Sequence, residues 1–379
     1  MRKWVHLMFV PVFLFLFAVS QPSCQKTSKE IVFGATFSLT GDNASYGEDA
    51  QRGINLAVDE INQQGGVQGY KIKVIFRDNR TNPSIAVNIM RQFANVEKVP
   101  VVLGSDASSV TLAMAPVANA TKTVLISPIS SSPDITHAGP YVFRTAPSDV
   151  EQAKVAAEWM WNLGYRKVAV LYVLNSWGKG LADAFQERFE ALGGVVTAKE
   201  GVEEQETNYR TVLLKLNKEN PDAFYMPTYS KQGARIVQQY REMGLKKPIL
   251  GGDTWGAPEF KNVGNELIEG IRFVAPGLYK GPEYQAFEKK FVERYGVNPD
   301  FNAASAYDAL YAVAKALDKV LSKNLPPTGE NIRKELLTVT FVGATGPIQF
   351  DENGDVVGKP FQRLIYRDGK AVPAEGVES

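Results

Sequence analysis

The stretch from residue 31 to residue 76 reads IVFGATFSLTGDNASYGEDAQRGINLAVDEINQQGGVQGYKIKVIF, and it decides the fold. Its first seven residues form a β-rich run. Residues 45–48 (SYGE) have the spacing of a capping box, and the apolar side chains of residues 54–61 recur with helical period, so a helix is predicted here. Gly65-Gly66 end this helix, and the alternation in residues 72–76 predicts a second strand. A strand, a helix and a second strand in this order predict a parallel βαβ unit.

The same alternation continues along the rest of the chain. It restarts after Pro147 with a helical segment at residues 150–163. Further strands are predicted at residues 100–104, 123–127, 168–173, 195–199, 223–226, 249–251 and 361–366. The sequence therefore predicts an α/β fold of two βα blocks, with mainly parallel sheets that helices cover on both faces. Polar residues follow several of these strands, and the carboxyl ends of parallel strands are where ligands bind.

The N-terminus has the pattern of an export signal. Arg2 and Lys3 precede an apolar run at residues 10–19 that is too short to span a bilayer, so we expect residues 1–24 to be a signal peptide and the protein to be exported to the periplasm or cell surface. Cys24 is the only cysteine, and its place just after this run predicts an N-terminal lipid anchor. The competing interpretation is ordinary cleavage after the small residues Ala18-Val19-Ser20.

Charge and composition exclude some classes of partner. The chain has 42 Lys and Arg against 41 Asp and Glu, and therefore lacks the basic excess that nucleic-acid binding requires. The same balance gives no reason to expect a membrane-surface patch, so the lipid anchor is the only membrane contact that we expect. About 350 residues remain after the signal segment, which is enough for two domains.

Many short motifs occur in the order seen in the branched-chain amino-acid type of periplasmic binding protein, which the chain resembles over essentially its whole mature length. The motifs that carry this resemblance are Ser38-Leu39-Thr40-Gly41, Tyr46-Gly47, Gly53, Ile61-Asn62, Gly65-Gly66-Val67, Gly69, Asp78, Pro83, Ala86, Gly104, Ser108-Ser109, Ser127-Pro128, Phe143-Arg144, Tyr172, Gly178, Gly180, Gly251, Asp253 and Gly346-Pro347.

The resemblance implies a type I periplasmic-binding fold, in which two Rossmann-like lobes are joined by three hinge crossings. It implies an N-terminal lobe of residues 31–146 and 277–348, and a C-terminal lobe of residues 147–276 and 349–379. The crossings are expected near Thr145 to Pro147, Ala275 to Leu278 and Gly346 to Phe350. Family membership also implies that the partner is the membrane permease of an ATP-driven importer, and that no cofactor is bound.

The resemblance further implies a site for the two charged ends of an amino acid. Ser108 and Ser131, with the backbone around Ser130, would hold the α-carboxylate, and Asp253 from the other lobe would take the ammonium group. Serines after a strand and before a helix suit an anion, because free N–H groups and the helix dipole attract it. Only a closed protein would then satisfy both ends of a zwitterion. The plainer alternatives are that the serines are caps or turn residues and that Asp253 is a solvated loop carboxylate.

Aromatic side chains are expected to wall this site. Tyr46, Trp177 and Tyr229 match family positions that line the cleft, and Tyr307 is a further candidate. Asp106 and Ala107 are expected beside them. Because a carboxylate is costly next to an aliphatic side chain, Asp106 argues against leucine, isoleucine and valine and favours a polar, cationic or otherwise amine-bearing ligand. The alternative is that Asp106 turns toward solvent or binds a water.

Other functions are weaker interpretations of the same sequence. Outside the signal segment His137 is the only histidine, so no Ser-His-Asp arrangement or histidine metal site is supported, and we expect a protein that is not an enzyme. A ligand sensor of the same fold, coupled to signalling, is one alternative. A receptor for a solute other than an amino acid, such as an amide, a urea-like compound or an aromatic acid, is another.

Overall fold

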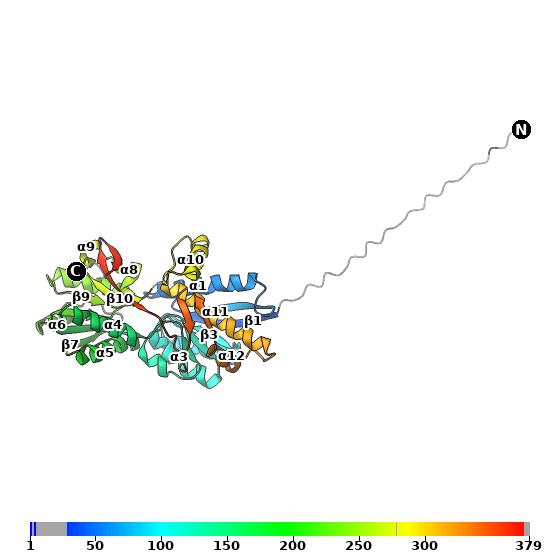
Figure 1. Cartoon of the computed structure of the whole chain (residues 1–379), viewed down its shortest axis with the longest axis horizontal. Helices are drawn as coiled ribbons and strands as arrows, with labels where there is room; N and C mark the ends of the chain where they lie inside the picture. The colour runs from blue at the N-terminus through cyan, green and yellow to red at the C-terminus, as the bar shows by residue number, and fades with distance from the viewer. Residues whose placement is uncertain (2–3, 5–28, 278, 375–379) are drawn as a thin grey trace.

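Two α/β lobes lie side by side in the computed structural model, which describes residues 1, 4, 29–277 and 279–374 (Figure 1). Each lobe is built on its own sheet. Apart from residues 1 and 4, the predicted signal segment lies outside the described residues, and so does Cys24.

The first lobe contains a five-stranded sheet in which every pair of neighbours is parallel. Residues alternate between its two faces: Phe33 packs in the core on one side, and its neighbour Val32 packs on the other. The strands, in spatial order, are β2 (Tyr70–Asp78), β1 (Lys29–Phe37), β3 (Val101–Gly104), β4 (Val124–Ser127) and β5 (Val142–Arg144).

Helices cover both faces of this sheet, because each face presents apolar side chains that must be buried. One face packs against α1 (Ala44–Gln63), α11 (Phe301–Ser322) and α12 (Gly329–Leu336). The other face packs against α2 (Pro83–Arg91), the π-helical turn η1 (Gln92–Val96), α3 (Ser108–Thr121) and the 3₁₀ turn η2 (Pro133–His137). A further helix, α10 (Pro282–Tyr295), packs against α1 and the start of α11.

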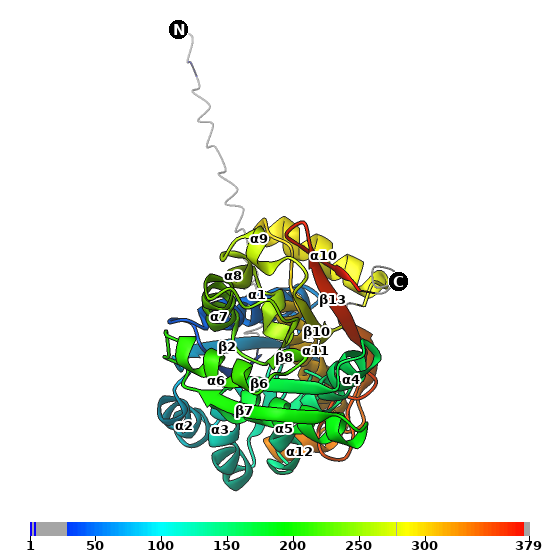
Figure 2. The ribbon, with the colours of Figure 1, turned by 90° about the vertical axis from the view of Figure 1, so that its left-hand side faces the viewer.

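The second lobe contains a seven-stranded sheet that is parallel except at one edge. Its last two strands join antiparallel, β13 against β10 and β14 against β13. In spatial order the strands are β14 (Lys370–Pro373), β13 (Phe361–Arg367), β10 (Arg272–Pro276), β9 (Ile249–Gly251), β8 (Ala223–Met226), β6 (Lys167–Val173) and β7 (Val195–Val202). Figure 2 faces this lobe and shows β6 and β7 in front.

Helices again pack on both faces of the second sheet. Those on one face are α4 (Asp149–Asn162) and α5 (Ser176–Ala191). Those on the other face are α6 (Arg210–Lys218), α7 (Ser230–Glu242), the 3₁₀ turn η3 (Asp253–Gly256), α8 (Pro258–Lys261) and α9 (Asn265–Ile268). The predicted two-lobe α/β fold with mainly parallel sheets is therefore confirmed.

The chain passes between the lobes three times. The first passage follows β5, and the second follows β10. A hairpin of β11 (Thr340–Gly343) and β12 (Gly346–Gln349) comes before the third. Phe350 and Val356, which follow β12, are still buried in the core of the first lobe, so the third passage lies between Val356 and Phe361. This is later than the expected Gly346 to Phe350, because a turn first pairs residues 354–356 with the backbone of Arg144.

The lobes also touch each other across the cleft. The hydroxyl of Tyr46 on α1 lies 2.9 Å from the hydroxyl of Ser230 at the start of α7. Next to it, the Lys231 ammonium lies 3.3 Å from the Asp42 carboxylate. At another point the Ser132 hydroxyl donates to the carbonyl of Ser176 over 3.1 Å. The lobes are thus closed upon each other.

Candidate functional site

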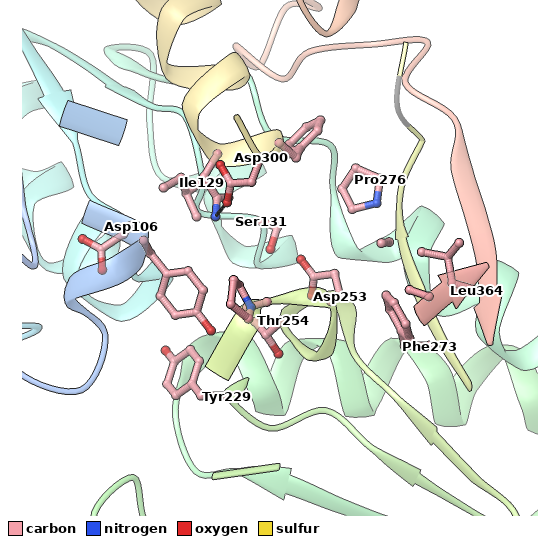
Figure 3. A pocket seen from close by; sticks show the side chains of 18 of the residues that line it. Asp106, Ile129, Ser131, Tyr229, Asp253, Thr254, Phe273, Pro276, Asp300 and Leu364 are labelled. Atoms are coloured by element: carbon pink, nitrogen blue, oxygen red, sulfur yellow. Dashed lines mark hydrogen bonds between the residues drawn. The ribbon is translucent and has the colours of Figure 1, made fainter. Parts of the chain in front are cut away.

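A cavity of about 280 Å³ lies between the lobes (Figure 3). Its volume is near the lower end of the range of small-molecule sites, about 300–1,000 Å³, so it suits a small solute. The first lobe contributes Tyr46, Asp106, Ser108, Ile129, Ser131, Pro299, Asp300, Phe301 and Asn302. The second lobe contributes Trp177, Tyr229, Asp253, Thr254, Gly256, Ala257, Pro258, Phe273, Ala275, Pro276, Gln362, Leu364 and Ala371.

The first lobe presents two serines to the cavity. Ser108 begins α3, and the dipole of this helix favours a negative charge at its N-terminus. Ser131 lies in the loop after β4, and this loop is held to α3 because the N–H of Ser132 donates to the Ser108 hydroxyl over 3.2 Å. Hydroxyl donors and a helix N-terminus therefore face the same space, as the sequence predicts.

The second lobe presents Asp253 to the same cavity. This residue begins η3 directly after β9, and Figure 3 shows its carboxylate in the middle of the lining. Burial raises the pKa of Asp253, and a hydrogen bond from the Gln152 amide, 3.3 Å from Oδ1, acts in the opposite direction. The Asp253 carboxylate thus has spare acceptor capacity for a cationic group of a ligand.

Asp106 lines the cavity as predicted, but its charge is already stabilised within the first lobe. Its Oδ1 accepts from the backbone N–H of Ser38 over 2.7 Å, its Oδ2 accepts from the Ser38 hydroxyl over 2.7 Å, and the Ser105 hydroxyl lies 3.1 Å from Oδ1. The side chain is 8% exposed, so it does not turn toward solvent. Burial raises the pKa of Asp106 and these donors act in the opposite direction, so Asp106 does not by itself require a cation in the ligand.

Three aromatic rings form one wall of the cavity. Trp177 and Tyr229 stack with their centroids 5.1 Å apart at 10°, and Tyr46 is tilted against Tyr229 at 6.4 Å. The amide of Asn175 donates to the Tyr229 hydroxyl over 3.0 Å, which fixes the orientation of that ring. Because Tyr46 comes from the first lobe and the other two from the second, closure completes the wall.

Removal of the Tyr46 hydroxyl is expected to weaken ligand affinity two- to fivefold without altering the fold. Tyr46→Phe keeps the ring but breaks the contact with Ser230, and a neutral hydrogen bond contributes about 0.5–1.5 kcal/mol. Isothermal titration calorimetry measures the change. Tyr165→Phe, on the second lobe away from the cavity lining, serves as the control, and equal effects in both variants would contradict a role in closure.

Three sequence candidates lie outside the lining. Ala107 is buried in the core behind the start of α3. The Ser130 hydroxyl is engaged by its own lobe, 2.9 Å from the Ser105 carbonyl and 2.8 Å from the Thr111 hydroxyl. Tyr307 lies on α11 and not at a strand end; its ring packs against α10, and its hydroxyl donates to Glu60 over 3.1 Å.

The structure adds lining residues that the sequence interpretation missed. Asp300 caps α11 by accepting from the Ala303 N–H over 2.8 Å, and Thr254 follows Asp253. The Asp300 cap is recognisable in the sequence before a long helical run, but nothing local indicates that α11 points at the cleft. Phe273 and Leu364 come from neighbouring strands, β10 and β13, whose antiparallel pairing is not readable from the sequence.

The charge of the lining is one-sided. Asp106, Asp253 and Asp300 are acidic, and the lining contains no lysine, arginine or histidine.

Within residues 29–277 and 279–374, no group of His, Cys, Asp or Glu side chains is placed to hold a metal ion. No helix in the described part of the chain has the length and apolar character needed to cross a membrane.

Known proteins resemble the chain over most of its length. Residues 30–362 match the periplasmic binding protein family. A Leu/Ile/Val-binding protein of Rhizobium johnstonii is 26% identical over 91% of this chain and 94% of its own length. A Leu/Ile/Val-binding protein homolog of Brucella suis is 28% identical over 86% of this chain and 87% of its own.

Solved structures agree with this assignment. The branched-chain amino acid transporter substrate-binding protein LivJ of Streptococcus pneumoniae, in complex with isoleucine, is 30% identical with a TM-score of 0.82, over 90% of this chain and 98% of its own. A leucine-binding protein of Thermotoga maritima is 28% identical with a TM-score of 0.82, over 90% and 97%. A Rhodopseudomonas palustris solute-binding protein in complex with benzoate shares the fold at 22% identity, with a TM-score of 0.81 over 91% and 95%. The chain therefore belongs to the periplasmic binding protein family, as a member related to the substrate-binding proteins of branched-chain amino-acid ABC transporters.

Proposed function

We propose that the protein is an extracytoplasmic receptor that closes around an amino acid or a closely related amine-bearing acid and delivers it to an ATP-driven permease. The observation that carries this proposal is the division of the cavity between the lobes. Ser108 and Ser131 on one lobe offer donors to a carboxylate, and Asp253 on the other offers an acceptor to an ammonium group. A dipolar solute gains both sets of contacts only in the closed protein, and this difference in binding energy drives closure.

The ligand class follows from the same lining. An aromatic acid without an amine would bring a further negative charge to the acidic lining of Asp253 and Asp300 and would meet no lysine, arginine or histidine there. Phe273, Pro276 and Leu364 leave an apolar part in which the side chain of an amino acid can lie. Because Asp106 is satisfied by Ser38 and Ser105, both an aliphatic and a polar side chain remain in the proposal.

A melting-temperature screen of the standard amino acids tests this function. A ligand at about a hundredfold excess over Kd adds roughly 2.7 kcal/mol to the free energy of unfolding, so a clear rise in Tm is expected for at least one amino acid. Benzoate and a neutral sugar are the controls. A shift with the sugar or with benzoate, and none with any amino acid, contradicts the proposal. Delivery is tested by uptake of the radiolabelled hit in cells with and without this protein.

A further inference from the structure

A buried carboxylate lies directly behind one of the two cavity serines. Asp149 is the first residue of α4, and its side chain is fully buried. The Ser131 hydroxyl lies 3.1 Å from Asp149 Oδ2, and the backbone N–H of Asp149 donates to the Ser131 carbonyl over 2.9 Å. Asp149 is absent from the cavity lining, so its hydrogen-bonding effect on a ligand is relayed by Ser131.

The surroundings of Asp149 differ from those of two buried carboxyl groups of the first lobe. Asp106 and Asp308 each accept three hydrogen bonds from N–H or O–H donors. Asp149 has the Ser131 contact at Oδ2, and its buried Oδ1 has no hydrogen-bond partner among the described residues. An ionised carboxylate offers about four acceptor positions, and leaving them empty in a buried site is costly.

Charged and titratable groups face Asp149 from three elements. Asp253 at the start of η3 repels a negative charge on Asp149, and Arg144 on β5 attracts one. The Arg144 guanidinium is already paired with the Asp355 carboxylate, at 2.6 Å. The Tyr225 hydroxyl on β8 is buried without a partner among the described residues. Burial, followed by the nearby Asp149 and Asp253 carboxylates, raises the pKa of this hydroxyl. Burial, followed by the nearby Asp253 carboxylate, raises the pKa of Asp149 well above its ordinary value.

The direction in which the Ser131 hydroxyl points decides what that hydroxyl can bind. A hydroxyl has one hydrogen to donate. If Asp149 is ionised, the Ser131 hydrogen must point back at Oδ2 and is not available to a ligand. If Asp149 is neutral, its own O–H can donate to Ser131 Oγ, and the Ser131 hydrogen is free to point into the cavity.

We propose that Asp149 is a positioning residue that is neutral in the folded protein and donates its proton to Ser131 Oγ, so that the Ser131 hydroxyl donates to the carboxylate of a bound solute. This inference rests on the proposed function, because it requires a carboxylate at Ser131. It predicts that binding is tied to the protonation state of a residue that never touches the ligand. Above the pH at which Asp149 loses its proton, affinity falls by up to tenfold per pH unit, because the charged form both withdraws the donor and repels the anion.

The experiment compares the wild-type protein with Asp149→Asn and Asp149→Ala, using L-leucine, L-glutamine and L-lysine as probes in calorimetric titrations from pH 5.5 to 9. The Asn amide can donate to Ser131 as the neutral acid does, so Asp149→Asn is expected to keep the affinity within about threefold and to remove this pH dependence. Asp149→Ala is expected to lose about tenfold at every pH. Asp149→Ala is expected to have no further effect in a Ser131→Ala background, because both act through the same hydroxyl.

An infrared difference spectrum of the ligand-free wild-type protein minus Asp149→Asn gives an independent reading. A carboxylic-acid carbonyl band is expected at pH 6, and it should disappear at the same pH at which wild-type affinity begins to fall. Absence of the band at pH 6, or equal losses of affinity in the Asn and Ala variants, overturns the positioning role and leaves the amino-acid site intact. If the band is present but none of the standard amino acids binds the wild-type protein, the proposed function fails, and with it the carboxylate that Ser131 is meant to receive.

Discussion

Replacement of Asp253 by asparagine is expected to lower the affinity for an amino acid by about tenfold to a hundredfold or more. A hydrogen bond to a charged group contributes about 1.5–3 kcal/mol, and each 1.4 kcal/mol is a factor of ten in Kd. The asparagine side chain fits the same space and can still accept from Gln152, so the fold is retained. Isothermal titration calorimetry with the amino acid that gives the largest thermal shift measures the loss.

The stability of the same variant gives a second, opposite readout. Because burial raises the pKa of folded Asp253, the folded protein holds this proton more tightly than the unfolded chain does. This contribution to the free energy of unfolding is complete below the unfolded pKa and is lost as the pH rises through the folded value, so the ionised form of Asp253 is a cost to the folded protein. The ligand-free Asp253→Asn variant should therefore melt at the same or a higher temperature than the wild-type protein.

Asp368→Asn is the matched control, since Asp368 is an aspartate of the same lobe, away from the cavity lining, in a left-handed backbone conformation that asparagine tolerates. It should leave both affinity and melting temperature unchanged. Unaltered affinity in Asp253→Asn would show that this carboxylate does not receive the ammonium group.

Replacement of Arg144 by leucine is expected to lower the free energy of unfolding by about 3 kcal/mol, because it leaves the partly buried Asp355 carboxylate uncompensated. The fully buried guanidinium makes two parallel bonds to Asp355, of 2.7 and 2.6 Å. It also donates to the carbonyls of Ser131 and Ser132 over 2.9 and 2.8 Å. Urea denaturation followed by circular dichroism measures the loss. Because the loop that carries Ser131 is released as well, ligand affinity should fall with stability.

Arg80→Leu provides the comparison for this prediction. The Arg80 side chain is 71% exposed and lies 3.8 Å from Asp78, a surface pair of the kind that contributes at most about 1 kcal/mol. Arg144→Lys tests the geometry of the pair, since an ammonium cannot replace the two parallel bonds to Asp355. The free energy of unfolding of this variant should lie between those of the wild-type protein and Arg144→Leu. Similar losses of the free energy of unfolding in Arg80→Leu and Arg144→Leu would contradict the stabilising role of the pair between Arg144 and Asp355.

The fold was predictable because its signals are local and repeated. The βαβ pattern of residues 31–76 appears in the structure as β1, α1 and β2, with the glycines at residues 65 and 66 ending the helix region. The sequence places the third passage between the lobes too early, because the position of this passage depends on a long-range pairing. The turn at residues 351–355 returns to Arg144 before the chain leaves the first lobe, and no short-range pattern encodes that contact.

The part of the cavity lining that comes shortly after strands was predictable from the sequence. Ser108, Ser131 and Asp253 each come shortly after a strand, and the structure brings all three to one cavity. Asp149 was missed because it reads as an ordinary acidic residue in the first turn of a helix, and only tertiary packing buries it behind Ser131. The prediction that Tyr307 walls the cleft was wrong for the converse reason. Tyr307 is aromatic, but it lies on the face of α11 that packs against α10.

The antiparallel edge of the second sheet affects the order in which the chain can fold. Strands β13 and β14 follow all the other described strands along the chain, yet β13 pairs with every residue of β10. The core of the first lobe likewise includes Phe350 and Val356, far along the chain from β1. Neither lobe can therefore be completed before residues 350–365 are present, and a product truncated before residue 361 would expose the open edge of β10 to aggregation.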